Sequence, residues 1–262
     1  MSVWDAYEDR VTVHGCSQRK SYLNREKHLI REKMKNSLAY HSVIIDGNKR
    51  DVTIDNCDNL NEKFIFALPG EELYIGGIVD WMENMWLITE LDANTTVYYK
   101  AKMVQCNYLL KWVDNNGQIC EQWAVVEDGT KYMTGEIEDR KFIVTKGDAR
   151  IAIRLPANHN TNMMDRTTRF LIDDTIGFGD SNGDVLAFGL TKPLKVGRTY
   201  NGHGIYAFVC SECQRTDDDN VELGIADYYK YYNKDGTRKV SEESKGGDVS
   251  DIEETNERKV WI

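Results

Sequence analysis

The stretch YHSVIIDGNKRDVTI, residues 40–54, sets Asp46-Gly47 between two segments rich in β-branched residues. A type I′ turn needs a positive φ at both central residues, and Asp-Gly satisfies this requirement at little cost. The stretch therefore predicts a β-hairpin that turns at Asp46 and Gly47. It also marks the point at which the apolar pattern of the chain changes to a period of two.

Downstream of this hairpin, short apolar segments recur at a spacing of roughly ten residues, and many are closed by Gly or Asn. The predicted strands cover residues 63–68, 76–81, 85–89, 97–106, 108–113, 122–126, 141–145, 150–155, 169–173, 185–190 and 205–209. A polar loop is expected over residues 158–166, and a short helix or turn over residues 222–229. Many short strands separated by turn residues indicate a mainly β protein built on a small barrel or sandwich.

Upstream of the hairpin, the pattern is helical. Ser2 and Asp5 have the spacing of a capping box, which predicts a helix over about residues 3–11. Leu23, Ile30 and Met34 follow helical spacing and predict an amphipathic helix over residues 18–35. Its basic residues form a candidate docking surface for an acidic partner or nucleic acid, and a solvated helix face is the alternative. They are Arg19, Lys20, Arg25, Lys27, Arg31 and Lys35.

The net charge of −10 is unevenly distributed. Residues 1–40 hold eight basic and five acidic side chains, whereas residues 41–232 hold 19 basic and 30 acidic ones. An acidic body does not attract the DNA backbone, so it suits a soluble protein or a surface that DNA slides past. The chain opens without a secretory signal, and its apolar runs are far shorter than the ~20 residues of a membrane span. We therefore expect a cytoplasmic protein, or one that leaves the cell inside a particle, without membrane association.

The last thirty residues are almost entirely polar until the sequence Lys259-Val260-Trp261-Ile262. This composition predicts a flexible acidic tail over residues 233–262. Val260, Trp261 and Ile262 form a candidate interface that adds as an edge strand to a neighbouring subunit. A frayed chain end is the alternative.

The six cysteines are expected to be free thiols, because a chain of this length has its own core and shows no export signal; disulfides are the alternative. Cys210-x-x-Cys213 lacks a second ligand pair at the spacing that structural zinc requires. The acidic stretch 180–184 fails as an EF-hand, because Val185 and Thr191 stand where Gly and Glu are needed. No metal or cofactor is predicted, although a zinc site at the cysteine pair and a looser calcium site stay open.

The search for catalytic motifs finds no serine nucleophile elbow, phosphate-binding loop or zinc-protease helix. The five histidines are scattered and stand in no motif with acids or thiols. We therefore predict that the chain is not an enzyme. Trp81, Trp86, Trp112 and Trp123 are expected in the core or at its rim, whereas an exposed position would suit stacking on sugars or bases.

Several segments resemble virion proteins of tailed phages. Residues 76–79 and 86–88 resemble strands of the SH3-like barrel in head-closure (stopper) proteins. Residues 101–112 are similar to a segment of putative head–tail connector proteins from phages and prophages of Gram-positive hosts. Residues 2–7 and 220–229 also resemble members of that group.

With this resemblance, the expected domains are an N-terminal helical segment (1–38), an SH3-like β-barrel (39–112), a second β domain (113–232) and the tail (233–262). The resemblance implies a ring, hexameric rather than dodecameric, that closes the head after DNA packaging and provides a platform for the tail. Implied partners are a portal or adaptor protein and tail-terminator or other tail proteins, and packaged DNA passes through the channel without sequence-specific binding. The implied location is the virion, assembled in the host bacterial cytoplasm. The alternative is a carbohydrate-binding or host-adhesion β module of a phage tail.

Overall fold

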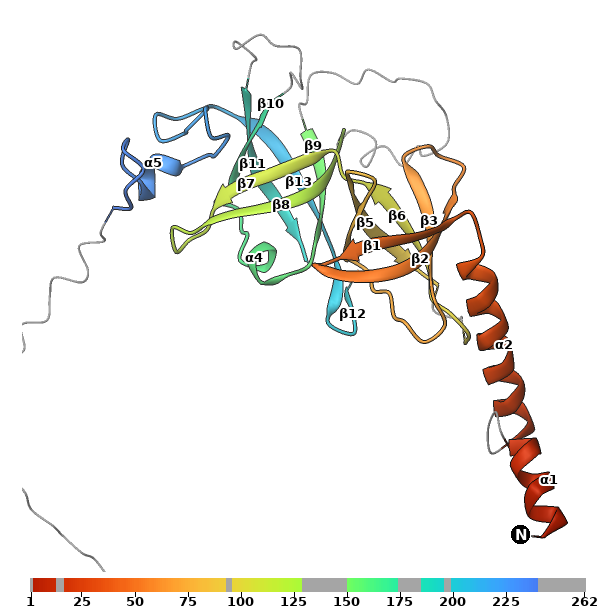
Figure 1. Cartoon of the computed structure of the whole chain (residues 1–262). Coiled ribbons are helices and arrows are strands. Elements are labelled where there is room, and N and C mark those ends of the chain that lie inside the picture. Colours follow the sequence, from red (N-terminus) through yellow and green to blue (C-terminus); the bar gives the residue numbers. More distant parts are fainter. Residues whose placement is uncertain are drawn as a thin grey trace, which may run out of the picture.

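The computed structural model describes residues 2–12, 17–92, 96–128, 150–173, 185–195 and 199–239. It shows a mainly β protein with two barrel-like sheets, preceded by helices α1 (Val3–Thr12) and α2 (Gln18–Lys35) (Figure 1). The predicted fold class is confirmed. The predicted strand at residues 141–145 and the acidic stretch 180–184 lie outside the described residues.

The first sheet is a closed barrel with the strand order β1-β2-β3-β6-β5-β4. Its strands are β1 (Tyr40–Ile45), β2 (Asn48–Asn56), β3 (Glu62–Ala67), β4 (Ile78–Trp81), β5 (Asn84–Leu91) and β6 (Lys100–Gln105). Alternate side chains point inward, so that Val43 and Ile45 of β1 meet Val52 of β2 and Met103 of β6 in one buried cluster. The period-two pattern of the sequence thus produces the barrel core.

Two hairpin turns of this barrel share one backbone conformation but differ in sequence. Asp46 and Gly47 have φ values of 46° and 80°, which confirms the predicted type I′ turn. Met82 and Glu83 join β4 to β5 with φ values of 50° and 61° although neither is a glycine. Side chains in this left-handed region cost roughly 1–2 kcal/mol per residue.

Replacing Glu83 with glycine is therefore expected to raise the free energy of unfolding by about 0.5–1 kcal/mol, because glycine relieves the strain at positive φ. The matched change Gly47→Ala should lower it by about 1 kcal/mol, since an added Cβ has nothing within 4 Å and only backbone strain acts. Urea unfolding of both variants checks the prediction. Equal signs for the two changes would contradict it.

The second sheet follows the order β10-β11-β13-β9-β8-β7, and β12 pairs with β13. Its strands are β7 (Tyr108–Val113), β8 (Ile119–Asp128), β9 (Arg150–Pro156), β10 (Arg169–Asp173), β11 (Val185–Leu194), β12 (Thr199–Tyr200) and β13 (His203–Cys213). Its interior holds a second buried cluster that includes Leu110, Trp112, Ile153, Phe170 and Phe208. Two short helices accompany it, α4 (His159–Asn162) and α5 (Tyr228–Tyr231). Helix α4 forms inside the predicted loop, because Asn158 and Thr161 make a capping box there.

The division between the two sheets falls near Asn107, earlier than the expected boundary at residues 112–113. Strand β7 pairs with β8 and so belongs to the second sheet. At this division, the side chain of Asn107 accepts the N–H of Val126 at 2.8 Å and donates to its carbonyl oxygen at 2.7 Å. This contact joins residues 19 positions apart, so the alternation of apolar residues gave no sign of it.

A shared apolar cluster joins the barrel to the second sheet. Leu87 and Val104 on the barrel side pack with Val125 and Ile205 on the other side. Nearby, the ring of Tyr74 stacks on His203 with centroids 4.3 Å apart. The Tyr74 hydroxyl also donates to Asp46 at 2.7 Å, so the first hairpin turn helps to position this inter-sheet contact.

Candidate functional site: interaction surfaces

Helices α1 and α2 form an arm, described over residues 2–12 and 17–35, that projects from the barrel away from both sheets (Figure 1). One half of the predicted capping box, the bond from the Ser2 backbone to the Asp5 side chain, is present at its start, and the Ser2 side chain caps Trp4 rather than Asp5. The N–H of Ser2 donates to Asp5 Oδ2 at 2.7 Å, and Ser2 Oγ accepts the N–H of Trp4 at 3.2 Å. These bonds satisfy backbone groups at the first turn and fix where α1 begins.

The apolar face of α1 is exposed to solvent. Val3, Trp4, Tyr7 and Val11 have exposed fractions of 86 %, 75 %, 59 % and 53 %. A helix turns about 100° per residue, so the four side chains lie within about 100° of one another around the axis. The Trp4 and Tyr7 rings make an edge-to-face pair with centroids 6.2 Å apart. A cluster of exposed aromatic and β-branched side chains on a projecting helix is typical of an interaction surface.

The sequence reasoning predicted α1 but overlooked its exposed face. The signal was present, because the spacing of Val3, Trp4, Tyr7 and Val11 is that of one helix face. Periodicity does not tell whether such a face meets the chain's own core or another molecule. The projection of the arm in the tertiary structure supplies that information.

The basic residues predicted for docking lie on α2, and most are exposed: Arg19, Lys20, Arg25, Arg31 and Lys35 are exposed and Lys27 is half-buried. The helical repeat places Lys20, Lys27, Arg31 and Lys35 within about 80° around the axis, with Arg19 and Arg25 on the two flanks. The Arg31 guanidinium also donates to the carbonyl oxygen of Pro69 in the barrel. Arg31 thus attaches the base of the arm, and the other basic side chains except Lys27 are exposed.

A second feature lies at the far end of the molecule, where the edge strands β7 and β10 meet. Side chains join them: the Tyr108 hydroxyl accepts the N–H of Asp173 at 3.0 Å and donates to the carbonyl oxygen of Leu171 at 3.4 Å. The rings of Trp112 and Phe170 meet edge to face inside the sheet, with centroids 6.3 Å apart. We call this junction the seam.

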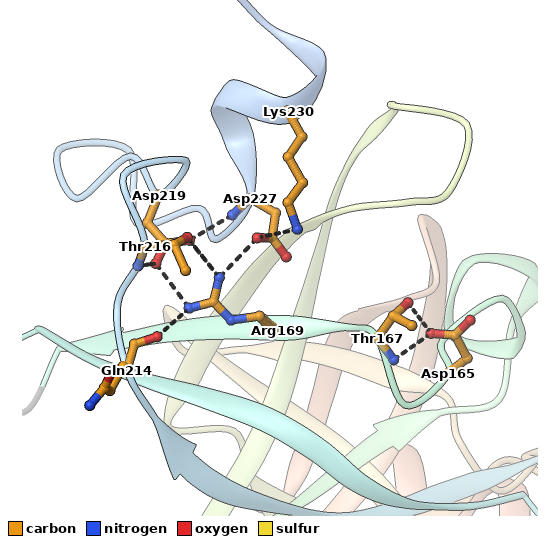
Figure 2. A network of polar contacts seen from close by, with 8 residues as sticks. All are labelled: Asp165, Thr167, Arg169, Gln214, Thr216, Asp219, Asp227 and Lys230. Carbon is orange, nitrogen blue, oxygen red and sulfur yellow. Dashed lines mark hydrogen bonds and ion pairs between the residues drawn. The ribbon is translucent and has the colours of Figure 1, made fainter.

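A strap, residues 214–239, crosses the outside of the seam after β13. Its first anchor is Arg169 of β10, whose guanidinium binds Asp219 through two bonds of 2.9 and 3.0 Å and Asp227 through one of 2.8 Å (Figure 2). The same group donates to the carbonyl oxygen of Gln214 and to Thr216 Oγ. The Asp219 side chain is only 1 % exposed. A buried carboxylate held by a forked guanidinium fixes the position of the strap on β10.

The second anchor of the strap is the turn between β7 and β8. The Tyr232 hydroxyl donates to the carbonyl oxygen of Gly117 at 2.8 Å, and the Arg238 guanidinium donates to that of Asn116. The strap therefore contacts both edge strands or their turns, on either side of the seam. It links strands that the sheet itself leaves as edges.

The charge network predicts acid sensitivity of the strap. Burial alone would raise the pKa of Asp219, but the N–H groups of Asp227 and Thr216 and the Arg169 guanidinium outweigh burial, so its pKa lies below the ordinary value. A carboxyl with a lowered folded-state pKa stabilises the fold above its unfolded pKa of about 3.9, and this stabilisation is lost as the pH falls through the folded-state pKa. Urea unfolding between pH 7 and pH 3 should show a smaller acid-induced loss in Asp219→Asn than in the unaltered protein. Parallel pH profiles would contradict this assignment.

The strap and the seam enclose a groove of about 220 Å³. One wall is Leu109 and Lys111 of β7, the floor includes Leu171 of β10, and the other wall is formed by strap residues 221–224. Within that wall, Val221 and Leu223 are 44 % and 45 % exposed. We call this feature the seam groove, and its lining mixes aliphatic side chains with the polar and charged groups of Tyr108, Lys111, Asp173 and Glu222.

The cysteine pair cannot act as the two ends of one metal site, because its members face opposite sides of β13. Cys210 lies in the interior cluster of the second sheet, whereas Cys213 packs in a small cluster on the outside with Leu171 and Ala226. Burial raises the pKa of the Cys210 and Cys106 thiols to about 12, which keeps them protonated at neutral pH. Within the described residues, no three His, Cys, Asp or Glu side chains gather as a metal site requires.

The four tryptophans weighed in the sequence occupy core or rim positions, as predicted. Trp86 and Trp112 are 5 % and 2 % exposed. Trp81 is partly buried against the barrel core, and Trp123 against the cluster between the sheets. Trp4, on the arm, is the exposed tryptophan among the described residues.

The predicted apolar tip, Val260, Trp261 and Ile262, lies outside the described residues, as does most of the tail. Of the helices in the described ranges, none combines the length and apolarity needed to span a bilayer. No protein-family model, curated protein sequence or solved structure matches this chain.

Proposed function

We propose that the protein is a structural subunit that assembles with copies of itself into a ring at the head–tail interface of a tailed phage. In this role the ring closes the head after DNA packaging and provides a platform for the tail. Its partners are a portal or adaptor protein on one side and tail proteins on the other. DNA passes through the ring without sequence-specific binding.

The observation that carries the assembly part of this proposal is the projecting arm with its exposed Val3, Trp4, Tyr7 and Val11. Burying aromatic and aliphatic side chains is favourable by about 25 cal/mol per Å² of apolar area. A projecting apolar face is therefore expected to find a partner surface. The resemblance of residues 101–112 and 220–229 to connector proteins supports the phage setting.

The charge distribution supports the same role. The body, residues 41–232, is strongly acidic, whereas α2 carries seven basic and two acidic side chains. Opposite charges on the arm and the body favour association of one copy with the next. An acidic channel wall also keeps DNA phosphates from binding tightly, so DNA is able to move through it.

The test has two parts. Light scattering and negative-stain images of the purified full chain should show a ring, with six subunits favoured over twelve. Mass spectrometry of purified phage particles should find the protein, and images should place it at the neck. A chain that stays monomeric at all concentrations, together with particles that lack it, overturns the proposal. Specific binding to a glycan array by the monomer would instead support the adhesion alternative.

A further inference from the structure

The arm and the C-terminal part of the chain carry opposite charges. Helix α2 has seven basic and two acidic side chains, and six of the seven basic ones are exposed. Among the residues that the structure describes, no carboxylate forms an ion pair with any of the seven. Residues 248–257 hold five acidic side chains and no basic one, whereas the 30 acidic side chains of residues 41–232 are interspersed with 19 basic ones. The acidic run 248–257 is therefore the more uniform counterpart of the basic helix.

Both parts of the chain continue into an apolar group. Outward from the barrel, the arm passes from basic α2 to α1 with its exposed apolar face. Along the C-terminal part, the acidic run passes through Arg258 and Lys259 to Val260, Trp261 and Ile262. Helix α1 has three acidic side chains and one basic one, so these two basic residues are also opposite in charge to α1. The order of charged and apolar groups is thus complementary along the whole arm.

The lengths of the two parts also agree. Helix α2, with 18 residues, is about 27 Å long, and α1, with 10 residues, is about 15 Å long. Because an extended chain covers at most ~3.3–3.6 Å per residue, residues 248–257 span up to about 35 Å and residues 258–262 up to about 17 Å. The C-terminal part is therefore long enough to run from the barrel end of α2 to the start of α1.

The arm of the same molecule lies out of reach of its own acidic run. The last described residue, Lys239, donates its N–H to Tyr231 of α5, and both sheets lie between α5 and the arm (Figure 1). A compact body of about 200 residues is about 40 Å across. Residues 240–247, which connect Lys239 to the acidic run, span about 28 Å at most. The acidic run is therefore placed to reach the arm of a neighbouring copy rather than its own.

We infer that residues 248–262 of one copy bind along the arm of the next copy, with the acidic run on α2 and Trp261 on the apolar face of α1. The inference rests on the proposed ring assembly and assigns a contact between its subunits. The two surfaces differ, so the contact is heterologous, and it generates a closed ring when the rotation between copies closes. The DNA backbone is the other anionic candidate for α2, but it offers no apolar group to cover the face of α1.

The decisive test exchanges the charges of the two surfaces in the full-length chain. The arm variant is Lys20→Glu/Arg25→Glu, and the C-terminal variant is Glu253→Lys/Glu254→Lys. Each should weaken self-association by about 10-fold in sedimentation experiments, because like charges then face each other. The variant with all four changes restores opposite charges and should associate within about threefold of the unaltered protein. Lys20 and Arg25 are exposed, so thermal melting should not change.

The matched control is Lys49→Glu/Lys234→Glu, which makes the same change in net charge at exposed lysines of the barrel and the strap and should leave assembly unchanged. The apolar half of the contact is tested by Trp4→Ala and Trp261→Ala. Each should weaken self-association by about 30-fold, as expected for loss of a central aromatic contact. If the two residues share one contact, the double variant should be no weaker than the weaker of the two single variants.

Cross-linking shows which copy supplies the bound segment. A carbodiimide couples carboxylates to nearby amines, so in a mixture of isotope-labelled and unlabelled copies, peptides that join residues 248–257 to lysines of α2 should carry both labels. Such links only within one copy, or no recovery in the variant with all four changes, overturn the docking inference, and rings at the phage neck then leave the proposed function standing.

The remaining outcomes separate the two proposals. Recovery in the variant with all four changes, with no protein in phage particles, retains the docking and overturns the phage role. Binding of the arm to duplex DNA, with self-association unaffected by the charge changes, assigns α2 to nucleic acid and overturns the docking. An unaltered protein that never self-associates overturns both.

Discussion

Replacing Arg169 with methionine is expected to lower the free energy of unfolding by about 3–5 kcal/mol, because it leaves the buried carboxylate of Asp219 without its cation. The guanidinium is 15 % exposed and binds two carboxylates, a carbonyl oxygen and a hydroxyl (Figure 2). Methionine keeps most of the side-chain length, so the loss reports the charge and its hydrogen bonds. Chemical denaturation at pH 7 measures the change.

Two companion variants make this result specific. Lys230 pairs with Asp227 in the same network but its side chain is 51 % exposed, so Lys230→Ala should cost no more than about 0.5 kcal/mol. Arg169→Lys keeps the positive charge but lacks the planar guanidinium. Its loss in the free energy of unfolding should lie between those of Arg169→Met and Lys230→Ala. If Arg169→Met and Lys230→Ala have equal effects, the strap does not depend on the buried pair. Hydrogen exchange in the strap should also rise in Arg169→Met before it rises in the barrel.

Replacing Gly76 with alanine is the second change with a large expected effect, about 3 kcal/mol of lost stability. Gly76 has a φ of +88°, and a Cβ built there lies 2.0 Å from the carbonyl oxygen of Gly204 in the second sheet. That oxygen already accepts the N–H of Ala157, and the N–H of Gly76 donates to Ile88, so both backbones are held in place. The methyl group therefore combines backbone strain with a steric clash between the two sheets.

Gly202 is the matched control for this clash. It has a similar φ of +81° in the turn between β12 and β13, but an added Cβ meets nothing within 4 Å. Gly202→Ala should therefore cost about 1 kcal/mol, the strain alone. Thermal unfolding of both variants separates the backbone strain from the steric clash. Equal losses of stability would show that the two sheets move apart enough to accommodate the methyl group. In Gly76→Ala, the stacking of Tyr74 on His203 should also weaken, visible as changed ring chemical shifts in NMR spectra.

The features that the sequence alone determined are those with local causes. Ser2 and Asp5 fixed the start of α1, and helical spacing predicted α2 with the bounds that it has, residues 18–35. Asp46-Gly47 fixed the first hairpin turn, because both residues tolerate a positive φ. The alternation of apolar and polar residues also predicted the bounds of β1, β7 and β10 correctly. In each case the information lies within a few neighbouring residues.

The tertiary structure alone decided how these elements combine. Arg169 and Asp219 are 50 positions apart, and no pattern near either residue shows that they pair. Strand β7 joined the second sheet by pairing with β8, next to the contact of Asn107 with Val126, 19 positions away. Met82-Glu83 adopted a glycine-like turn because the paired strands on both sides hold it. The exposure of the apolar face of α1 was also decided by the tertiary structure, because helical spacing predicts an apolar face but not which surface, if any, covers it. Local patterns set the conformation of each segment, whereas the choice among its contacts depends on packing between residues distant in the chain.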